Sequence, residues 1–219
     1  MLDVVARSAP SKSLSRSRIV TTSRSLSAIK RPGLDLCVWR RAPADGFAAW
    51  CNRLARSNEF VIDERGVRVK TFDLSRSLVE VPDGEMKDLW LADLRELMAA
   101  YVRLVGDVAL RVQLSTIDSR KCPRFHVDNV GLRLLCTYAG PGTEWIEEHQ
   151  LDREHMTECN LDHAPVKKGG VVEHLQRFDV AVAKGRAFAG NGRFGLVHRS
   201  PAVTAGPRIV FTLDTQPSR

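Results

Sequence analysis

Residues 108–114 read VALRVQL, and apolar side chains occupy every second position of this stretch. Successive side chains of a β-strand point to opposite faces, so this alternation predicts a strand with one buried face and one polar face. Similar short stretches follow at 132–138, 178–183, 195–198 and 208–213, with Gly or Pro residues between them. Short strands separated by such turns predict an antiparallel jelly roll or barrel with helices packed outside it.

The part of the chain before residue 108 predicts a supporting scaffold. Its expected elements are strands at 18–20 and 34–39, a helical turn at 25–29, a helix over about 45–56, a hairpin over 60–72 around Arg65 and Gly66, and a long helix over about 85–105. Asp45 and Asp83 are the expected N-caps of the two helices. Apolar residues of the long helix, among them Leu89, Trp90 and Leu94, repeat at helical spacing, which is more typical of a core than of a cofactor site.

These patterns divide the chain into a tail, a scaffold and a core. Residues 1–16 are Ser-, Arg- and Lys-rich without an apolar period, which predicts a disordered basic tail. Residues 17–107 form a helical and strand scaffold packed on the barrel, and residues 108–219 form the β core. We expect 17–219 to be one folded unit, which is an ordinary size for a single domain.

The net charge of +7 is unevenly placed along the chain. Residues 1–35 hold seven basic and two acidic residues, so +5 of this charge belongs to the N-terminal part. The remaining chain is close to neutral, and nucleic-acid binding by the folded body is therefore not expected. The basic start also resembles an organellar transit peptide in composition, which is an alternative to a plain tail.

The cysteines and the hydropathy of the chain limit the cellular compartments in which the protein is expected. The five cysteines are an odd number and include no CxxC pair, so a disulfide framework is not expected and a reducing cytoplasm is the default. No apolar stretch approaches the roughly 20 residues that a spanning helix needs, so no membrane partner is expected.

The sharpest local feature is residues 124–128, RFHVD. His126 and Asp128 are two residues apart, so on an extended segment both side chains point the same way. A single HxD is weak evidence, because a strand-end His bonded to a neighbouring Asp is a common alternative. His198 follows 70 residues after Asp128. Two His and one carboxylate with open positions are the ligand set of non-haem Fe(II) oxygenases.

The sequence from His198 to Arg208, HRSPAVTAGPR, resembles the C-terminal signature of the 2-oxoglutarate/Fe(II)-dependent oxygenase superfamily. The resemblance covers residues 108–214 and implies an α+β fold built on a double-stranded β-helix, a jelly-roll or cupin-like barrel with N-terminal supporting helices. It further implies that His126, Asp128 and His198 bind the metal. Arg208 would hold a carboxylate of the co-substrate 2-oxoglutarate, which suits a bidentate guanidinium.

One position departs from the superfamily pattern. The residue two after the Arg is usually Ser or Thr there, but it is Val210 here, and the next hydroxyl belongs to Thr212. One expected hydrogen bond to the co-substrate is thereby removed, so the metal site has more support than the use of 2-oxoglutarate.

A second resemblance is to an uncharacterised, mainly bacterial family, domain-of-unknown-function family 1826. It is carried by residues 31–33, 38–41, 124–128, 132–138, 140–145 and 195–201. This similarity extends over most of the chain and implies no particular reaction.

Several other residues are weaker candidates. Arg133, Thr137 and Tyr138 follow the HxD and could reach the pocket, with Arg133 and Tyr138 as co-substrate ligands, although each is also an ordinary barrel residue. Cys122 could be a further ligand, which would favour Zn(II) over Fe(II), or simply a loop thiol. His155, Cys159 and His163 have i, i+4, i+8 spacing that could bind zinc on a helix, but they occupy a charged insert that could equally be solvated.

Two functions follow from these observations. The first is an Fe(II)/2-oxoglutarate-dependent oxygenase of the hydroxylase type, acting on a small molecule or peptide that the sequence does not identify. The second is a non-catalytic cupin-like metal-binding protein linked to zinc or metal homeostasis, as the resemblance to the uncharacterised family suggests. Arg208 separates them, because a storage site needs no buried guanidinium, unless an acid such as Asp179 or Asp214 pairs with it. A nucleic-acid repair dioxygenase is disfavoured by the near-neutral body.

Overall fold

The computed structural model describes residues 15–119, 122–156, 164–191, 195–202 and 206–215. Its elements, in chain order, are β1 (Ser17–Val20), η1 (Ser23–Lys30), β2 (Leu36–Trp39), α1 (Phe47–Ser57), β3 (Val61–Val67), η2 (Leu74–Ser77), α2 (Glu85–Val105), β4 (Leu110–Ile117), β5 (Leu132–Ala139), β6 (Glu144–Ile146), η3 (Glu148–Gln150), η4 (Glu154–Met156), β7 (Glu173–His174), β8 (Val180–Lys184), β9 (Val197–Arg199) and β10 (Arg208–Thr215).

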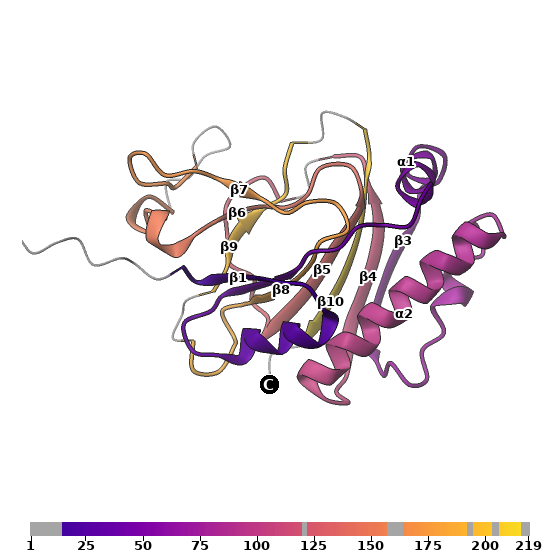
Figure 1. Cartoon of the computed structure of the whole chain (residues 1–219), viewed down its shortest axis with the longest axis horizontal. Coiled ribbons are helices and arrows are strands. Elements are labelled where there is room, and N and C mark those ends of the chain that lie inside the picture. The colour runs from indigo at the N-terminus through magenta and orange to yellow at the C-terminus, as the bar shows by residue number, and fades with distance from the viewer. Residues whose placement is uncertain (1–14, 120–121, 157–163, 192–194, 203–205, 216–219) are drawn as a thin grey trace, which may run out of the picture.

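Within the described residues, the strands form two sheets (Figure 1). The large sheet has seven strands in the order β1-β2-β8-β5-β10-β4-β3, and the small sheet has three in the order β7-β6-β9. Neighbouring strands are antiparallel except for β1 and β2, which are parallel. Helices α1 and α2 lie along one side of the large sheet, so the small sheet and the helices are on different sides of it.

Strand β10 shows how the large sheet separates a core from a cavity. Its residues Ile209, Phe211 and Leu213 are fully buried in the main hydrophobic cluster. Arg208, Val210 and Thr212 alternate with them and line a cavity on the opposite face. The expected two-faced strand is therefore present, and its polar face belongs to the cavity rather than to solvent.

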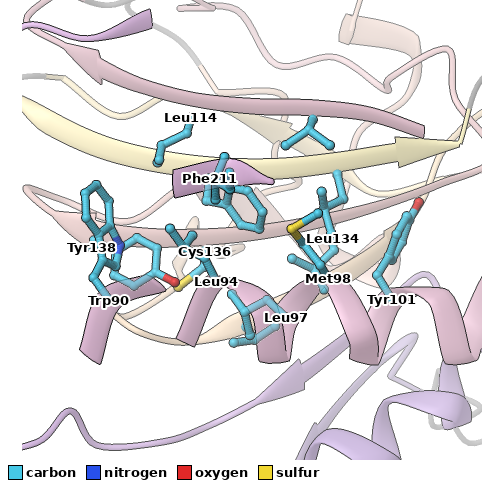
Figure 2. Close-up of a cluster of buried hydrophobic side chains, with 14 of the residues drawn as sticks. Trp90, Leu94, Leu97, Met98, Tyr101, Leu114, Leu134, Cys136, Tyr138 and Phe211 are labelled. Atoms are coloured by element: carbon cyan, nitrogen blue, oxygen red, sulfur yellow. The ribbon is translucent and has the colours of Figure 1, made fainter. Parts of the chain in front are cut away.

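Helix α2 covers the apolar face of the sheet and has the bounds that its sequence period predicts. Figure 2 shows its buried residues, including Trp90, Leu94 and Tyr101, lying against sheet residues such as Phe211. The Tyr101 hydroxyl donates to the Leu132 carbonyl at 2.5 Å, which ties the helix to β5. Among the described helices, none combines the length and apolarity that a membrane crossing requires.

Three local expectations are wrong. The expected hairpin at Arg65-Gly66 is instead a single strand, β3, which pairs with β4 and has a register shift where Gly66 adopts a φ of 74°. An irregularity of this kind is a β-bulge, which a glycine in a strand also signals. Asp45 and Asp83 are not the N-caps, because Gly46 and Gly84 occupy those positions without a side-chain cap.

The N-terminal segment joins the large sheet through a polar cluster. Ser15 and Ser17 donate hydrogen bonds to Glu147, and the Arg16 guanidinium binds the Asp35 carboxylate at 2.5 and 3.0 Å. Asp35 is buried and the Arg16 side chain is partly exposed, so this ion pair is only partly shielded from solvent. Residues 15 and 16, which the sequence places in the tail, are thus held by Glu147 and Asp35. Residues 1–14 of the expected tail lie outside the described residues.

The packing of α2 on the sheet predicts the cost of truncating its side chains. Leu94 is fully buried, so Leu94→Ala should lower the free energy of unfolding by about 2–5 kcal/mol. Leu89, which the sequence pattern also marks as apolar, is 38% exposed, and Leu89→Ala should change stability by no more than about 0.5 kcal/mol. Urea unfolding of both variants measures the difference; equal losses would contradict this packing.

Candidate metal centre

Two short backbone segments bring His126 and His198 face to face. The amide of each residue donates to the carbonyl of the other at 3.0 Å, which makes them a hydrogen-bonded antiparallel pair. Asp128 follows His126 by two residues and points to the same side. The chain beyond Asp128 packs closely on Gly185, where an added Cβ would lie 2.8 Å from the Asp128 carbonyl. Any larger residue at position 185 would therefore displace this segment.

The three side chains offer one ligand atom each, and these atoms all lie within 4.8 Å of one another. His126 Nε2 is 3.5 Å from Asp128 Oδ1, and His198 Nε2 is 3.2 Å from Asp128 Oδ2. The expected convergence of His126, Asp128 and His198 is thus present in the structure. Two imidazoles and a carboxylate at this separation fit one divalent ion.

Backbone carbonyls orient both imidazoles. His126 Nδ1 is 2.8 Å from the Arg124 carbonyl, and His198 Nδ1 is 3.1 Å from the Leu196 carbonyl. A carbonyl oxygen only accepts, so each Nδ1 carries the hydrogen. In the neutral imidazole Nε2 then keeps its lone pair and faces the centre of the cluster, which is the arrangement that second-sphere partners impose on metal-binding His residues.

The ion-paired group of Asp128, Asp214 and Arg133 carries a net negative charge beside the cluster, which favours a cation there. Asp128 and Asp214 contribute two negative charges, and Arg133 compensates one of them by pairing with both. Burial opposes ionisation of Asp128, but hydrogen bonds with His126 and His198 and the charge of Arg133 hold its pKa well below the ordinary value. The hydrogen bond with Asp128 raises the pKa of His126. A metal ion bound at Nε2 would take the place of that proton.

Arg208 is a buried guanidinium with neutral partners. It is 1% exposed, its Nε donates to the Pro141 carbonyl at 2.8 Å, and its Nη2 lies 3.4 Å from the Thr143 hydroxyl. Within the described residues no carboxylate lies within ion-pair distance of it. Burial lowers the pKa of Arg208 to about 10, against a smaller opposing effect of Glu144, so the side chain remains a cation at neutral pH.

The two acids expected as structural partners of Arg208 bind elsewhere. Asp179 pairs with Arg40 at 3.4 Å, and Asp214 pairs with Arg133 at 2.6 Å. The stem of Arg208 is packed on Gly140, where an added Cβ would lie 2.6 Å from Arg208 Cγ. Gly140 also has a φ of 74°, so the turn before β6 depends on glycine for both backbone conformation and space.

A cavity of about 190 Å³ connects the triad with Arg208. Its wall is formed by side chains of β4, β5 and β10, by the triad, and by residues near β6 and β9; the lining residues are Gln113, Ser115, Ile117, Cys122, His126, Asp128, Arg133, Leu135, Thr143, His198, Ser200, Arg208, Val210 and Thr212. The sequence did not indicate Thr143, Gln113 or Ser115 as cavity residues. The one local signal is the Gly-Pro-Gly sequence at 140–142, which indicates a constrained turn before Thr143.

The other sequence candidates have different positions. Tyr138 points away from the cavity: it is fully buried among the aromatic residues of the core, and its hydroxyl donates to Asp93 at 2.5 Å. The expectation that Tyr138 contacts a co-substrate is therefore wrong. Thr137, also expected near the pocket, is buried and is not among the lining residues. Its hydroxyl has no hydrogen-bond partner among the residues that the structure describes. Arg133 does line the cavity, but two carboxylates occupy its guanidinium.

Among the described residues, neither Cys122 nor the charged insert adds a ligand to the cluster. Cys122 is exposed and lines the cavity without joining the three ligand residues. In the insert, His155 Nδ1 is 2.9 Å from Asp152, while Cys159 and His163 lie outside the described residues.

The architecture is that of a double-stranded β-helix. It is similar to the crystal structure of a dioxygenase for auxin oxidation from rice, with a TM-score of 0.53 and 12% identity over 89% of this chain and 76% of that one. It is also similar to dioxygenase for auxin oxidation 1 from Arabidopsis thaliana in a binary complex with 2-oxoglutarate, with a TM-score of 0.53 and 8% identity over 93% of this chain and 92% of that one. At such low identity the similarity establishes the fold alone, and it confirms the expected α+β barrel.

The chain belongs to the family described as "Protein of unknown function (DUF1826)", whose model matches residues 21–214. The expected membership is thereby confirmed. No curated protein matches the chain by sequence.

The contact between His126 and Asp128 can be tested in the metal-free protein by NMR. Asp128→Asn should lower the pKa of His126, because the variant loses the hydrogen bond that raises it. In the unaltered protein this contact stabilises the fold at pH values below the ordinary His pKa of about 6.5, and the contribution is lost as the pH rises through the folded-state value. His149 and His174, outside the cluster, serve as internal controls. An unchanged His126 titration in the variant would contradict the geometry.

Proposed function

We propose that the protein is an Fe(II)/2-oxoglutarate-dependent oxygenase of the hydroxylase type. His126, Asp128 and His198 would hold the iron, and Arg208 would hold the co-substrate. The substrate, a small molecule or peptide, is left open. The ligand set supports iron, because two His and one carboxylate with open positions are typical of non-haem Fe(II) oxygenases.

The burial of the Arg208 guanidinium in the cavity that it shares with the triad is the observation on which the proposal rests. Burying a guanidinium without an anionic partner costs several kcal/mol, and none of the described residues forms an ion pair with Arg208, so an anion is expected to complete this site. The anion would have to enter the cavity that Arg208 shares with the triad. A dicarboxylate meets both requirements, because one end can bind Arg208 while the other reaches the metal ligands. A protein that only stores metal has no use for such a cation.

Thr143 would replace the hydroxyl that Val210 lacks. Its Oγ1 lies 3.4 Å from Arg208 Nη2 and faces the same cavity, although it comes from the residue before β6 rather than from β10. A carboxylate bound by Arg208 would therefore have a second donor beside it. The departure at Val210 thus weakens the assignment of 2-oxoglutarate less than the sequence alone suggests.

The chain's own residues would position and shield the reactants. Bound iron supplies the activation of O₂ that couples decarboxylation of the 2-oxo acid to hydroxylation of a C–H bond. The carbonyl-bound imidazoles keep two nitrogens aimed at one point, and the Asp128 carboxylate balances part of the metal charge. Leu135, Val210 and Ile117 place apolar groups on the cavity wall, which limits the access of water.

Substitution of Arg208 should separate co-substrate binding from metal binding. Arg208→Ala should weaken 2-oxoglutarate binding by at least about 30-fold, since truncating one partner of a buried charge pair costs about 2–5 kcal/mol. It should leave Fe(II) binding intact, whereas His198→Ala should lose both. Anaerobic titration of the iron-loaded protein with 2-oxoglutarate measures the affinities, and succinate release under O₂ measures turnover.

Arg103→Ala on the exposed face of α2 is the matched control and should change neither quantity. If the unaltered, iron-loaded protein neither binds 2-oxoglutarate nor releases succinate, the oxygenase assignment fails. Metal binding without either activity would favour the non-catalytic metal-binding protein instead.

The assignment of Thr143 is tested against Thr212, the next hydroxyl after Val210 on β10, which also lines the cavity. Thr143→Val keeps the side-chain shape and should weaken 2-oxoglutarate binding by at least about tenfold, because a hydrogen bond to a charged group contributes about 1.5–3 kcal/mol. Thr212→Val should have a smaller effect, because the Thr212 hydroxyl lies 3.4 Å from Gln113 Oε1. The opposite ranking in the same titration would assign the hydroxyl to Thr212.

A further inference from the structure

Arg133 forms the centre of a partly buried ion-pair chain beside the metal ligands. Its Nη1 donates to Asp128 Oδ2 at 2.5 Å, and its Nε and Nη2 bind the two oxygens of Asp214 at 2.6 and 2.7 Å. Arg133 and Asp214 are directly opposite each other in the β5–β10 ladder, and Asp214 is 2% exposed. The guanidinium is a rigid plane, so the bidentate contact with Asp214 also fixes the nitrogen that meets Asp128.

Because of this contact, the two carboxylate oxygens of Asp128 have different surroundings. Oδ2 accepts the Arg133 hydrogen bond and also lies 3.2 Å from His198 Nε2, so one of its lone pairs is already used. Oδ1 lies 3.5 Å from His126 Nε2 and is the oxygen that Arg133 leaves free. A carboxylate held in this way cannot turn both oxygens freely toward a metal ion. The orientation of the acidic ligand is therefore set by a residue on β5 that is not itself a ligand.

We propose that Arg133 is a positioning residue that restricts Asp128 to one oxygen for the metal, and that Asp214 positions Arg133. The inference rests on the proposed metal site. A one-oxygen carboxylate occupies one coordination position where a two-oxygen carboxylate would occupy two. The restriction keeps a coordination position open for co-substrate or O₂. It also gives Arg133 and Asp214, which are far apart in the sequence, a role in the site.

A purely structural role for Arg133 predicts the opposite change in metal affinity when this residue is replaced. If Arg133 merely neutralised Asp128 in a structural ion pair, it would compete with a metal ion, and its removal would tighten metal binding. If it orients the carboxylate, its removal weakens metal binding. Partners that orient metal ligands typically contribute about 10–100-fold to metal affinity.

Mn(II) titration of the full chain, followed by the electron paramagnetic resonance signal of free Mn(II), tests the proposal. Arg133→Gln should weaken Mn(II) binding by about 10–100-fold, and Arg133→Lys should recover part of the loss because it keeps one charged donor. Asp214→Asn leaves Asp128 and Arg133 in place but loosens Arg133, so an intermediate loss is expected. The Co(II) absorption spectrum of these variants should also change, which a purely structural role would not cause.

Arg111→Gln is the matched control. Arg111 is the other cross-strand neighbour of Asp214, but it pairs with Asp63 and does not line the cavity. This variant should keep the Mn(II) affinity and the Co(II) spectrum of the unaltered protein.

The outcomes separate this inference from the proposed function. Unaltered or tighter Mn(II) binding by Arg133→Gln, with normal binding by the unaltered protein, would overturn the positioning role alone. Absence of Mn(II) binding by the unaltered protein would overturn the metal site and this inference together. If Arg133→Gln does not fold, Asp214→Asn decides the question: an affinity equal to that of Arg111→Gln would overturn the proposal.

Discussion

The register of β10 between β4 and β5 is the constraint on which the rest of the structure depends. Side chains of a strand alternate between faces, so one register places Ile209, Phe211 and Leu213 against α2 and, at the same time, Arg208 in the cavity. A slip by one residue would exchange the two sets and bury Arg208 among apolar side chains. Packing of the apolar side chains of β10 in the core therefore also fixes where the cavity-facing side chains of the same strand lie.

Arg133 and Arg208 lie on the same face of the sheet but have different electrostatic surroundings. Two carboxylates compensate Arg133, whereas Arg208 has a carbonyl and a hydroxyl as its near partners. The difference arises from which strand neighbours each residue has, not from the overall charge of the chain. The excess of basic residues in the first 35 positions gives no information about this site.

The sequence predicts those parts of the fold that a local period or a short motif encodes. The long helix at 85–105 and the strands near 132–138 and 208–213 were predicted because their apolar spacing is regular. The prediction of a hairpin at 60–72 is wrong because a glycine between two apolar stretches is compatible with both a turn and a β-bulge. The error on Tyr138 was avoidable: it is five residues from Arg133, and residues an odd number apart on a regular strand face opposite sides. Thr143 and the pairing of Arg133 with Asp214 depend on contacts between distant segments, which no local pattern contains.

The polar cluster around Ser15, Arg16 and Ser17 bears on where the folded unit begins. The family match starts at residue 21, after the end of β1, yet β1 is the outermost strand beside β2. A polypeptide trimmed to the matched region would leave β2, with its buried Leu36, Cys37 and Val38, as an uncovered apolar strand at the margin of the sheet. Unprotected edges of this kind can pair with strands of other molecules, so β1 covers an apolar edge that would otherwise favour self-association.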